Sequence, residues 1–236
     1  MTKKMKPALM KLIMEYRGEL EKICALIPLE EMERRGTYTD WTFRDSVAHY
    51  SEWMLHSALR CSGRPIRRGE DFEAENQMIF EQYKDSTWQN VCNLAGHATT
   101  ELAGALEKLS EEELNSTDKY LWQRDRALWR EVMQAGYWHP MEHFSSYLID
   151  HGNPQEALRI QQTIVNGLAS LTDHPDVNAA ARYNMACFYA RTAQPEKALE
   201  LLPECFQLNP GLKEWSRQDG DLKILHGTAA FEALFN

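Results

Sequence analysis

Two histidines lie four residues apart near the middle of the 236-residue chain, in the segment GYWHPMEHFSSYLIDHG at positions 136–152. On an α-helix this spacing is about one turn, so the imidazoles of His139 and His143 would leave the same face within reach of one ion. Such a pair alone is weak evidence for a metal, because surface or core histidines at this spacing are the ordinary alternative. A metal site therefore needs a further ligand from elsewhere in the chain.

His49 is the best candidate for that further ligand. It lies about two turns into a helix that begins with Thr42 and, three residues later, Asp45, which is the pattern of a capping box. His49 also shares a helix face with Trp53, and facing helices of a bundle build metal sites from inward side chains. Three neutral imidazoles with an open position are typical of a catalytic zinc or similar divalent ion, whereas a structural site usually has a fourth protein ligand. No cysteine lies near these histidines in the sequence.

Three other histidines are weaker candidates. His56 lies seven residues after His49 on the same stripe, and its place two turns further along the helix favours the core or the rim of the bundle. His97 and His151 have no partner at ligand spacing, and we interpret both as structural.

Several residues are positioned to support the site. Asp45 lies one turn before His49 and can orient its imidazole; the alternative is that Asp45 only caps the helix. Trp41, Trp53 and Trp138 can wall a pocket near the ion, although tryptophans at helical spacing are more often core residues. The sequence assigns no residue as a catalytic acid, base or nucleophile.

The elements that must position these residues are helices. Apolar residues recur at three- and four-residue spacing and almost nothing alternates with period two, so we expect an all-α fold. Helices are expected over about 6–27, 43–60, 71–84, 87–109 and 126–151, with Ser86 and Gln89 forming the capping box of the fourth. The four longer helices predict a four-helix bundle over residues 1–151.

Pro140 lies inside the last of these helices. It has no backbone N–H, and its ring crowds the carbonyl group four residues earlier. That residue is Gly136, which adjusts most easily because it has no side chain. We therefore expect a bent but continuous helix.

Residues 152–236 differ in kind. The segments HGNPQEALRI at 151–160 and TAQPEKALEL at 192–201 share a Pro-x-x-Ala-Leu core forty-one residues apart, and the small and large positions around the second match a tetratricopeptide unit. About three such units are needed to bury their own faces. We therefore expect a short helical hairpin tail that packs on the first domain or on a second subunit.

Composition narrows the class of protein. The net charge of −9 argues against a nucleic-acid binder, which needs a basic surface. No stretch approaches the roughly 20 apolar residues of a membrane span, so no membrane association is expected. The five cysteines are odd in number and form no CxxC pair. They fit a reduced, cytoplasmic compartment in which they serve as small core residues.

Two motifs resemble a known family. DWTFRDSVAHYSEW at 40–53 resembles the start of the second helix in DinB-like four-helix bundles, and the HxxxH of 139–143 is similar to that family's second and third ligands. The resemblance implies that His49, His139 and His143 form a metal set, commonly zinc or nickel. Pro140, directly after the second ligand, departs from the family pattern. AENQMIFEQYKDSTWQNV is similar to a branch of the family that includes a colibactin self-resistance protein, and NPGLKEWSRQDGDLKIL resembles the end of a tetratricopeptide block.

The resemblance implies a metal-dependent enzyme, either a hydrolase or a transferase that uses a low-molecular-weight thiol. Its substrate would be a small, toxic or electrophilic molecule, which suggests a role in detoxification, and a homodimer is a further expectation. Two alternatives stay open at this point. The chain can be a non-catalytic interaction module with the tail as its binding surface, or the metal can be purely structural.

Overall fold

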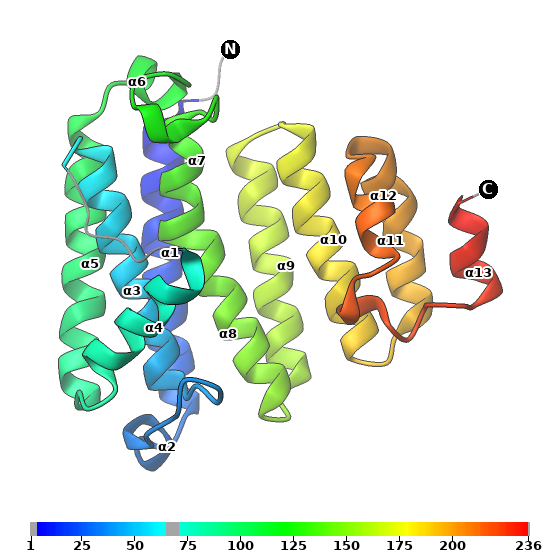
Figure 1. Ribbon diagram of the computed structural model, residues 1–236, viewed down its shortest axis with the longest axis horizontal. Helices are drawn as coiled ribbons and strands as arrows, with labels where there is room; N and C mark the ends of the chain where they lie inside the picture. Colours follow the sequence, from blue (N-terminus) through cyan, green and yellow to red (C-terminus); the bar gives the residue numbers. More distant parts are fainter. Residues whose placement is uncertain (1–3, 65–70, 236) are drawn as a thin grey trace. The chain divides into compact units, whose positions relative to one another are not determined.

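The computed structural model describes residues 4–64 and 71–235. In that part of the chain every regular element is a helix, apart from one isolated antiparallel bridge between Thr37 and Asp40 (Figure 1). The all-α prediction is confirmed. The chain divides into two compact units, Met1–Phe144 and Ser145–Asn236, where the sequence predicted a boundary after residue 151. No described helix has the length and apolar character that crossing a membrane would require.

The first unit is a four-helix bundle with short connecting helices. Its long members are α1 (Met5–Leu26), α3 (Phe43–Cys61), α5 (Trp88–Lys108) and a composite helix that begins with α7 (Leu128–Met133). The shorter elements are α2 (Leu29–Glu33), α4 (Phe72–Tyr83), α6 (Glu111–Asn115) and η1 (Leu121–Gln123). α3 packs on α5 and α7, and α1 packs on the same two helices. Tyr16 lies in the middle of the core, stacked on Phe144 at 6.0 Å and edge-on to Tyr50 at 5.9 Å between ring centroids.

The start of α3 is fixed by the capping box that the sequence predicts. The Thr42 hydroxyl accepts the Asp45 amide at 3.3 Å, and the Asp45 carboxylate accepts the Thr42 amide at 3.0 Å. Arg44, which is only 2% exposed, donates to the carbonyl oxygens of Lys84 and Ser86. These bonds tie α3 to the segment that leads into α5.

The predicted cap of α5 was wrong by one residue. Thr87, not Ser86, is the N-cap residue, and its hydroxyl accepts the Asn90 amide at 3.3 Å. The Ser86 carbonyl instead accepts a hydrogen bond from the buried Arg44 guanidinium. Residues 44 and 86 are far apart in the sequence, so no local motif predicts this contact.

The composite helix runs from Leu128 to Asp150 without interruption, as expected. Between α7 and α8 (His139–Asp150) lies one π-helical turn, η2 (Gln134–Trp138), in which the His139 amide donates to the Gln134 carbonyl five residues earlier. The wider turn accommodates Pro140, which cannot donate a hydrogen bond. Gly136 has a second function here, because a Cβ atom on it would lie 2.8 Å from Leu102 Cδ2 and 2.9 Å from Ile13 Cγ1. The glycine therefore lets α1 and α5 approach this turn.

The second unit is a series of helices, α9 (Pro154–Leu171), α10 (Pro175–Arg191), α11 (Pro195–Leu208), α12 (Gly211–Ser216), η3 (Gly220–Leu222), α13 (Ala229–Glu232) and η4 (Ala233–Phe235). The repeated Pro-x-x-Ala-Leu segments begin α9 and α11, with proline in the first turn of each. The residues before the two prolines share one backbone shape, with a positive φ at Gly152 and Ala193. The sequence repeat is thus a structural repeat.

A single carboxylate joins the end of the second unit to α10. Asp219 Oδ2 accepts the Tyr183 hydroxyl at 2.8 Å and the Trp215 indole N–H at 3.1 Å. Leu222 and Leu225, which follow Asp219, are fully buried against the core that α10 and α11 form. The C-terminal segment is therefore an integral part of this unit's core.

Candidate metal centre

The three histidines singled out by the sequence meet inside the first unit. His49 comes from α3, and His139 and His143 come from the first turns of α8. His139 Nε2 lies 3.2 Å from His49 Nε2 and 3.0 Å from His143 Nε2. One ring nitrogen from each residue lies within 4.8 Å of the other two. Residues ninety positions apart in the sequence thus present the same ring nitrogen to one point.

This arrangement fits a divalent ion. Two nitrogens that each lie about 2.0–2.1 Å from a tetrahedral ion are about 3.3 Å apart, which is close to the separations found here. Pro140 does not turn His139 away, because the π-helical turn takes up the distortion before α8 begins. The described residues contribute three ligands to this group and no fourth.

Burial keeps the three imidazoles neutral. It lowers the pKa of His49 to about 2, His139 to about 3 and His143 to about 4, from an ordinary value of 6.5. The neighbouring imidazoles lower the pKa of His49 and His139 further, because two positive rings cannot approach so closely. Neutral imidazole is the form that binds a metal, so the site is ready for one at neutral pH.

The lowered pKa values predict how the metal-free protein responds to acid. The unfolded chain takes up protons at these histidines below about 6.5, whereas the folded chain does not until the pH nears the lowered values. Above pH 6.5 these histidines are neutral in both states and the free energy of unfolding does not depend on them. As the pH falls from 6.5 towards 4, the unfolded chain gains protons that the folded chain does not, and the free energy of unfolding decreases. Urea unfolding at pH 7 and pH 5 should show a smaller fall in His143→Gln than in the native sequence. An equal fall in both proteins would contradict the lowered pKa of His143.

Aromatic side chains surround His49. The Trp41 ring lies 4.7 Å from the His49 ring and the Trp53 ring 6.4 Å from it, measured between centroids. These two tryptophans wall the site as the sequence suggested. Trp138 is the third tryptophan that the sequence suggested for this wall. Its indole N–H donates to Glu142, one turn later on the same helix, at 2.9 Å.

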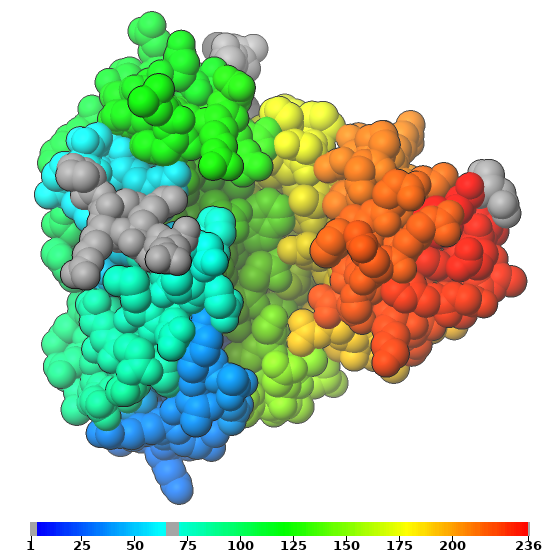
Figure 2. Space-filling model, in the orientation of Figure 1, coloured from blue at the N-terminus to red at the C-terminus, as the bar shows by residue number. Residues whose placement is uncertain are grey.

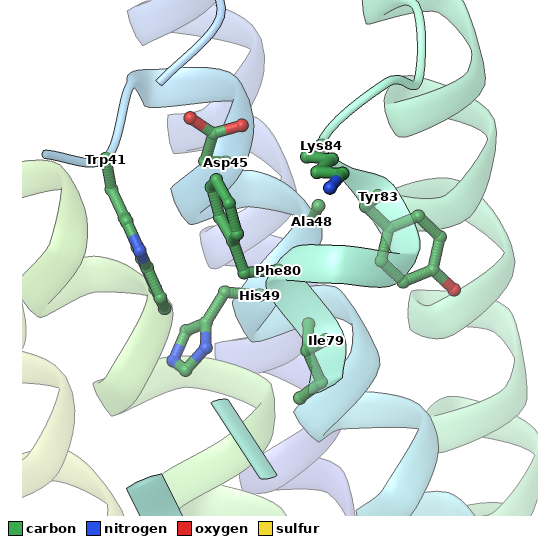
Figure 3. Close-up of a pocket in the computed structure, with 8 residues that line it drawn as sticks. All are labelled: Trp41, Asp45, Ala48, His49, Ile79, Phe80, Tyr83 and Lys84. Atoms are coloured by element: carbon green, nitrogen blue, oxygen red, sulfur yellow. The ribbon is translucent and has the colours of Figure 1, made fainter. Parts of the chain in front are cut away.

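A small cavity borders His49 on the side of α4. α4 lies across the face of the first unit seen in Figure 2 and packs on α3. The cavity is lined by Trp41, Asp45, Ala48, His49, Ile79, Phe80, Tyr83 and Lys84 (Figure 3). The sequence predicted α4 as a helix but did not indicate that it contributes to the site. The spacing of apolar residues shows which face of a helix is buried, but not which other helix that face packs on.

Asp45 does not hold His49. Its carboxylate accepts the Gly36 amide at 3.1 Å and the Thr42 hydroxyl at 2.7 Å, and pairs with Arg44 at 3.3 Å. The Nδ1 atom of His49 is buried, and no described residue forms a hydrogen bond with it. Of the two interpretations of Asp45, the structure supports the helix cap.

The remaining histidines lie outside the cluster. His56 is placed between two carboxylates, with Nε2 3.4 Å from Glu52 and Nδ1 3.6 Å from Glu75. His97 is exposed on α5, and His151 is exposed at the end of α8. The buried group around His56 was not anticipated. Glu52 lies one turn before His56 on α3, but Glu75 comes from α4, so no pattern within one helix indicates the group.

The described residues contain one further group with metal-binding side chains, formed by Cys187, Asp219 and Asp221 in the second unit. Its central carboxylate already accepts hydrogen bonds from Tyr183 and Trp215. We therefore interpret this group as a structural hydrogen-bond network.

Neither protein-family models, nor curated proteins, nor solved structures gave a match to this chain. The proposed function therefore rests on the chemistry of the site and on the resemblance of its sequence motifs.

Proposed function

We propose that the chain is a metal-dependent enzyme of the DinB-like kind, in which His49, His139 and His143 hold one divalent ion, with zinc or nickel preferred. The observation that carries this proposal is the convergence of three neutral Nε2 atoms at separations of 3.0 and 3.2 Å for the two shorter pairs. Imidazole ligands suit zinc and nickel, whereas magnesium and calcium prefer oxygen.

The reaction class follows from the number of ligands. With three protein ligands, a tetrahedral ion keeps a position for a small molecule. A divalent ion with an open position supplies Lewis acidity and lowers the pKa of water or of a thiol towards neutrality. Water gives a hydrolase and a low-molecular-weight thiol gives a transferase. The protein's own part is to hold the ligands neutral and oriented.

The nature of the substrate is part of the same proposal. Tryptophan rings beside His49 favour a small molecule with an apolar portion. We further propose a toxic or electrophilic substrate, as the family resemblance implies. A cytoplasmic setting, which the number and spacing of the cysteines favour, and a homodimeric state are part of the same proposal.

Metal analysis of protein purified without an affinity tag tests the proposal. We expect close to one zinc or nickel ion per chain, and turnover of model electrophiles that depends on that ion. Activity that needs an added thiol would favour the transferase, and activity in its absence the hydrolase. A folded helical protein that takes up no metal even when zinc is supplied would contradict the proposal and favour the interaction module.

A further inference from the structure

His49 has a ring nitrogen that finds no hydrogen-bond partner among the described residues. If Nε2 binds the ion, as the proposed function requires, Nδ1 carries the proton and is a hydrogen-bond donor. Histidines that bind metals almost always donate this second N–H to a carboxylate, a carbonyl oxygen or a water molecule. His49 is 5% exposed, and its buried Nδ1 atom has no such acceptor in the part of the chain that the structure describes.

A second donor in the same state lies beside it. The indole Nε1 of Trp41 is also buried, and residues 4–64 and 71–235 offer it no partner. An indole N–H can only donate. The Trp41 and His49 rings are 4.7 Å apart between centroids, and both residues line the cavity of Figure 3. The two buried donors thus belong to neighbouring residues that line one cavity.

The other polar side chains around this cavity are engaged elsewhere. The Asp45 carboxylate serves the cap of α3 and Arg44. The Tyr83 hydroxyl donates to Glu52 at 2.7 Å, and the Lys84 ammonium donates to Glu81 at 2.5 Å. The described side chains that line the cavity therefore leave the acceptor to a bound molecule.

The size of the cavity limits what that acceptor can be. The space open to the centre of a water-sized sphere is about 10 Å³, close to the least that one water molecule requires. Ala48, Ile79 and Phe80 supply the apolar part of its lining. One oxygen atom with two lone pairs meets the needs of both donors, whereas an amine would add a third donor.

We propose that this cavity is a subsite for a single hydrogen-bond-accepting oxygen, shared by Trp41 Nε1 and His49 Nδ1. The oxygen belongs to a bound water or to the carboxylate or carbonyl group of a small ligand. This proposal rests on the proposed function, because the proton on Nδ1 follows from metal binding through Nε2. It makes Trp41 a positioning residue that acts on His49 through the shared oxygen.

The test uses zinc-loaded protein with ¹⁵N-labelled tryptophan, titrated with sodium acetate. We expect the Trp41 indole signal to move and saturate with acetate. Trp41→Phe, which keeps an aromatic ring and removes the N–H, should weaken acetate binding about tenfold or more. Trp53→Phe is the matched control, because the Trp53 indole already donates to Asn76 at 3.1 Å and acetate binding should not change.

The outcomes separate the two sources of the oxygen. A Trp41 indole proton that does not respond to acetate but shows magnetisation transfer from a bound water identifies that water as the source of the oxygen. A proton that shows neither response overturns the proposal. An indole proton that exchanges freely with and without acetate, together with equal acetate binding by Trp41→Phe, overturns the proposal. Zinc content is measured first, so failure to bind zinc counts against the proposed function alone.

Discussion

Replacing His49, His139 or His143 by alanine should each lower the affinity for zinc by a factor on the order of 100 or more. Loss of a residue that merely orients a ligand already costs 10- to 100-fold in metal affinity, about the least to expect when a ligand itself is lost. Two imidazoles and solvent make a poor zinc site, because each lost ligand must be replaced by water. Isothermal titration with zinc, or competition with a chelator, would measure the change.

His97→Ala is the control for this experiment. His97 is exposed on α5, away from the three ligands, so its removal should leave zinc affinity within error of the native value. Circular dichroism should show that all four variants keep their helices. If one of the three ligand variants bound zinc as tightly as His97→Ala does, that histidine would not be a ligand.

Asp45→Ala should lower the free energy of unfolding by about 3 kcal/mol and leave zinc affinity of the folded protein unchanged. The variant leaves the buried Arg44 guanidinium without its acid partner, and breaking a buried pair costs about 3–5 kcal/mol. It also removes the acceptor for the Gly36 and Thr42 amides. Urea unfolding measures the loss, and zinc titration at low denaturant measures the affinity.

Asp40→Ala is the matched control for Asp45. Asp40 is an exposed acid just before the same helix, and its replacement should change stability by less than about 0.5 kcal/mol. If Asp45→Ala left stability intact but weakened zinc binding tenfold, the carboxylate would act on His49 and its helix-capping role would be secondary.

The three-histidine cluster could be predicted because local signals fix each part of it. The capping box sets where α3 begins, and therefore which face His49 occupies. The four-residue spacing of His139 and His143 guarantees a common face on any helix that is continuous between them. What remained was the meeting of two helices, which a bundle provides.

Other features could not be predicted, because long-range contacts decide them. Asp45 is used by the Gly36 amide, which comes from an irregular loop that carries no periodic pattern. The Ser86 carbonyl is taken by Arg44 from another helix, which moves the N-cap of α5 to Thr87. The cavity beside His49 depends on α4, whose sequence shows a helix but not its neighbour.

The π-helical turn Gln134–Trp138 also separates two requirements that an ordinary helix would combine. A turn that closes over five residues instead of four shifts the angular phase of everything after it by about one residue, or about 100°. The apolar side chains of α7, such as Leu128 and Val132, fill the core in one phase. His139 and His143 face the interior in another. The residues that pack the core before the turn and the residues that bind the ion after it therefore occupy different angular positions on the helix. A substitution in one set then leaves the positions of the other set unchanged.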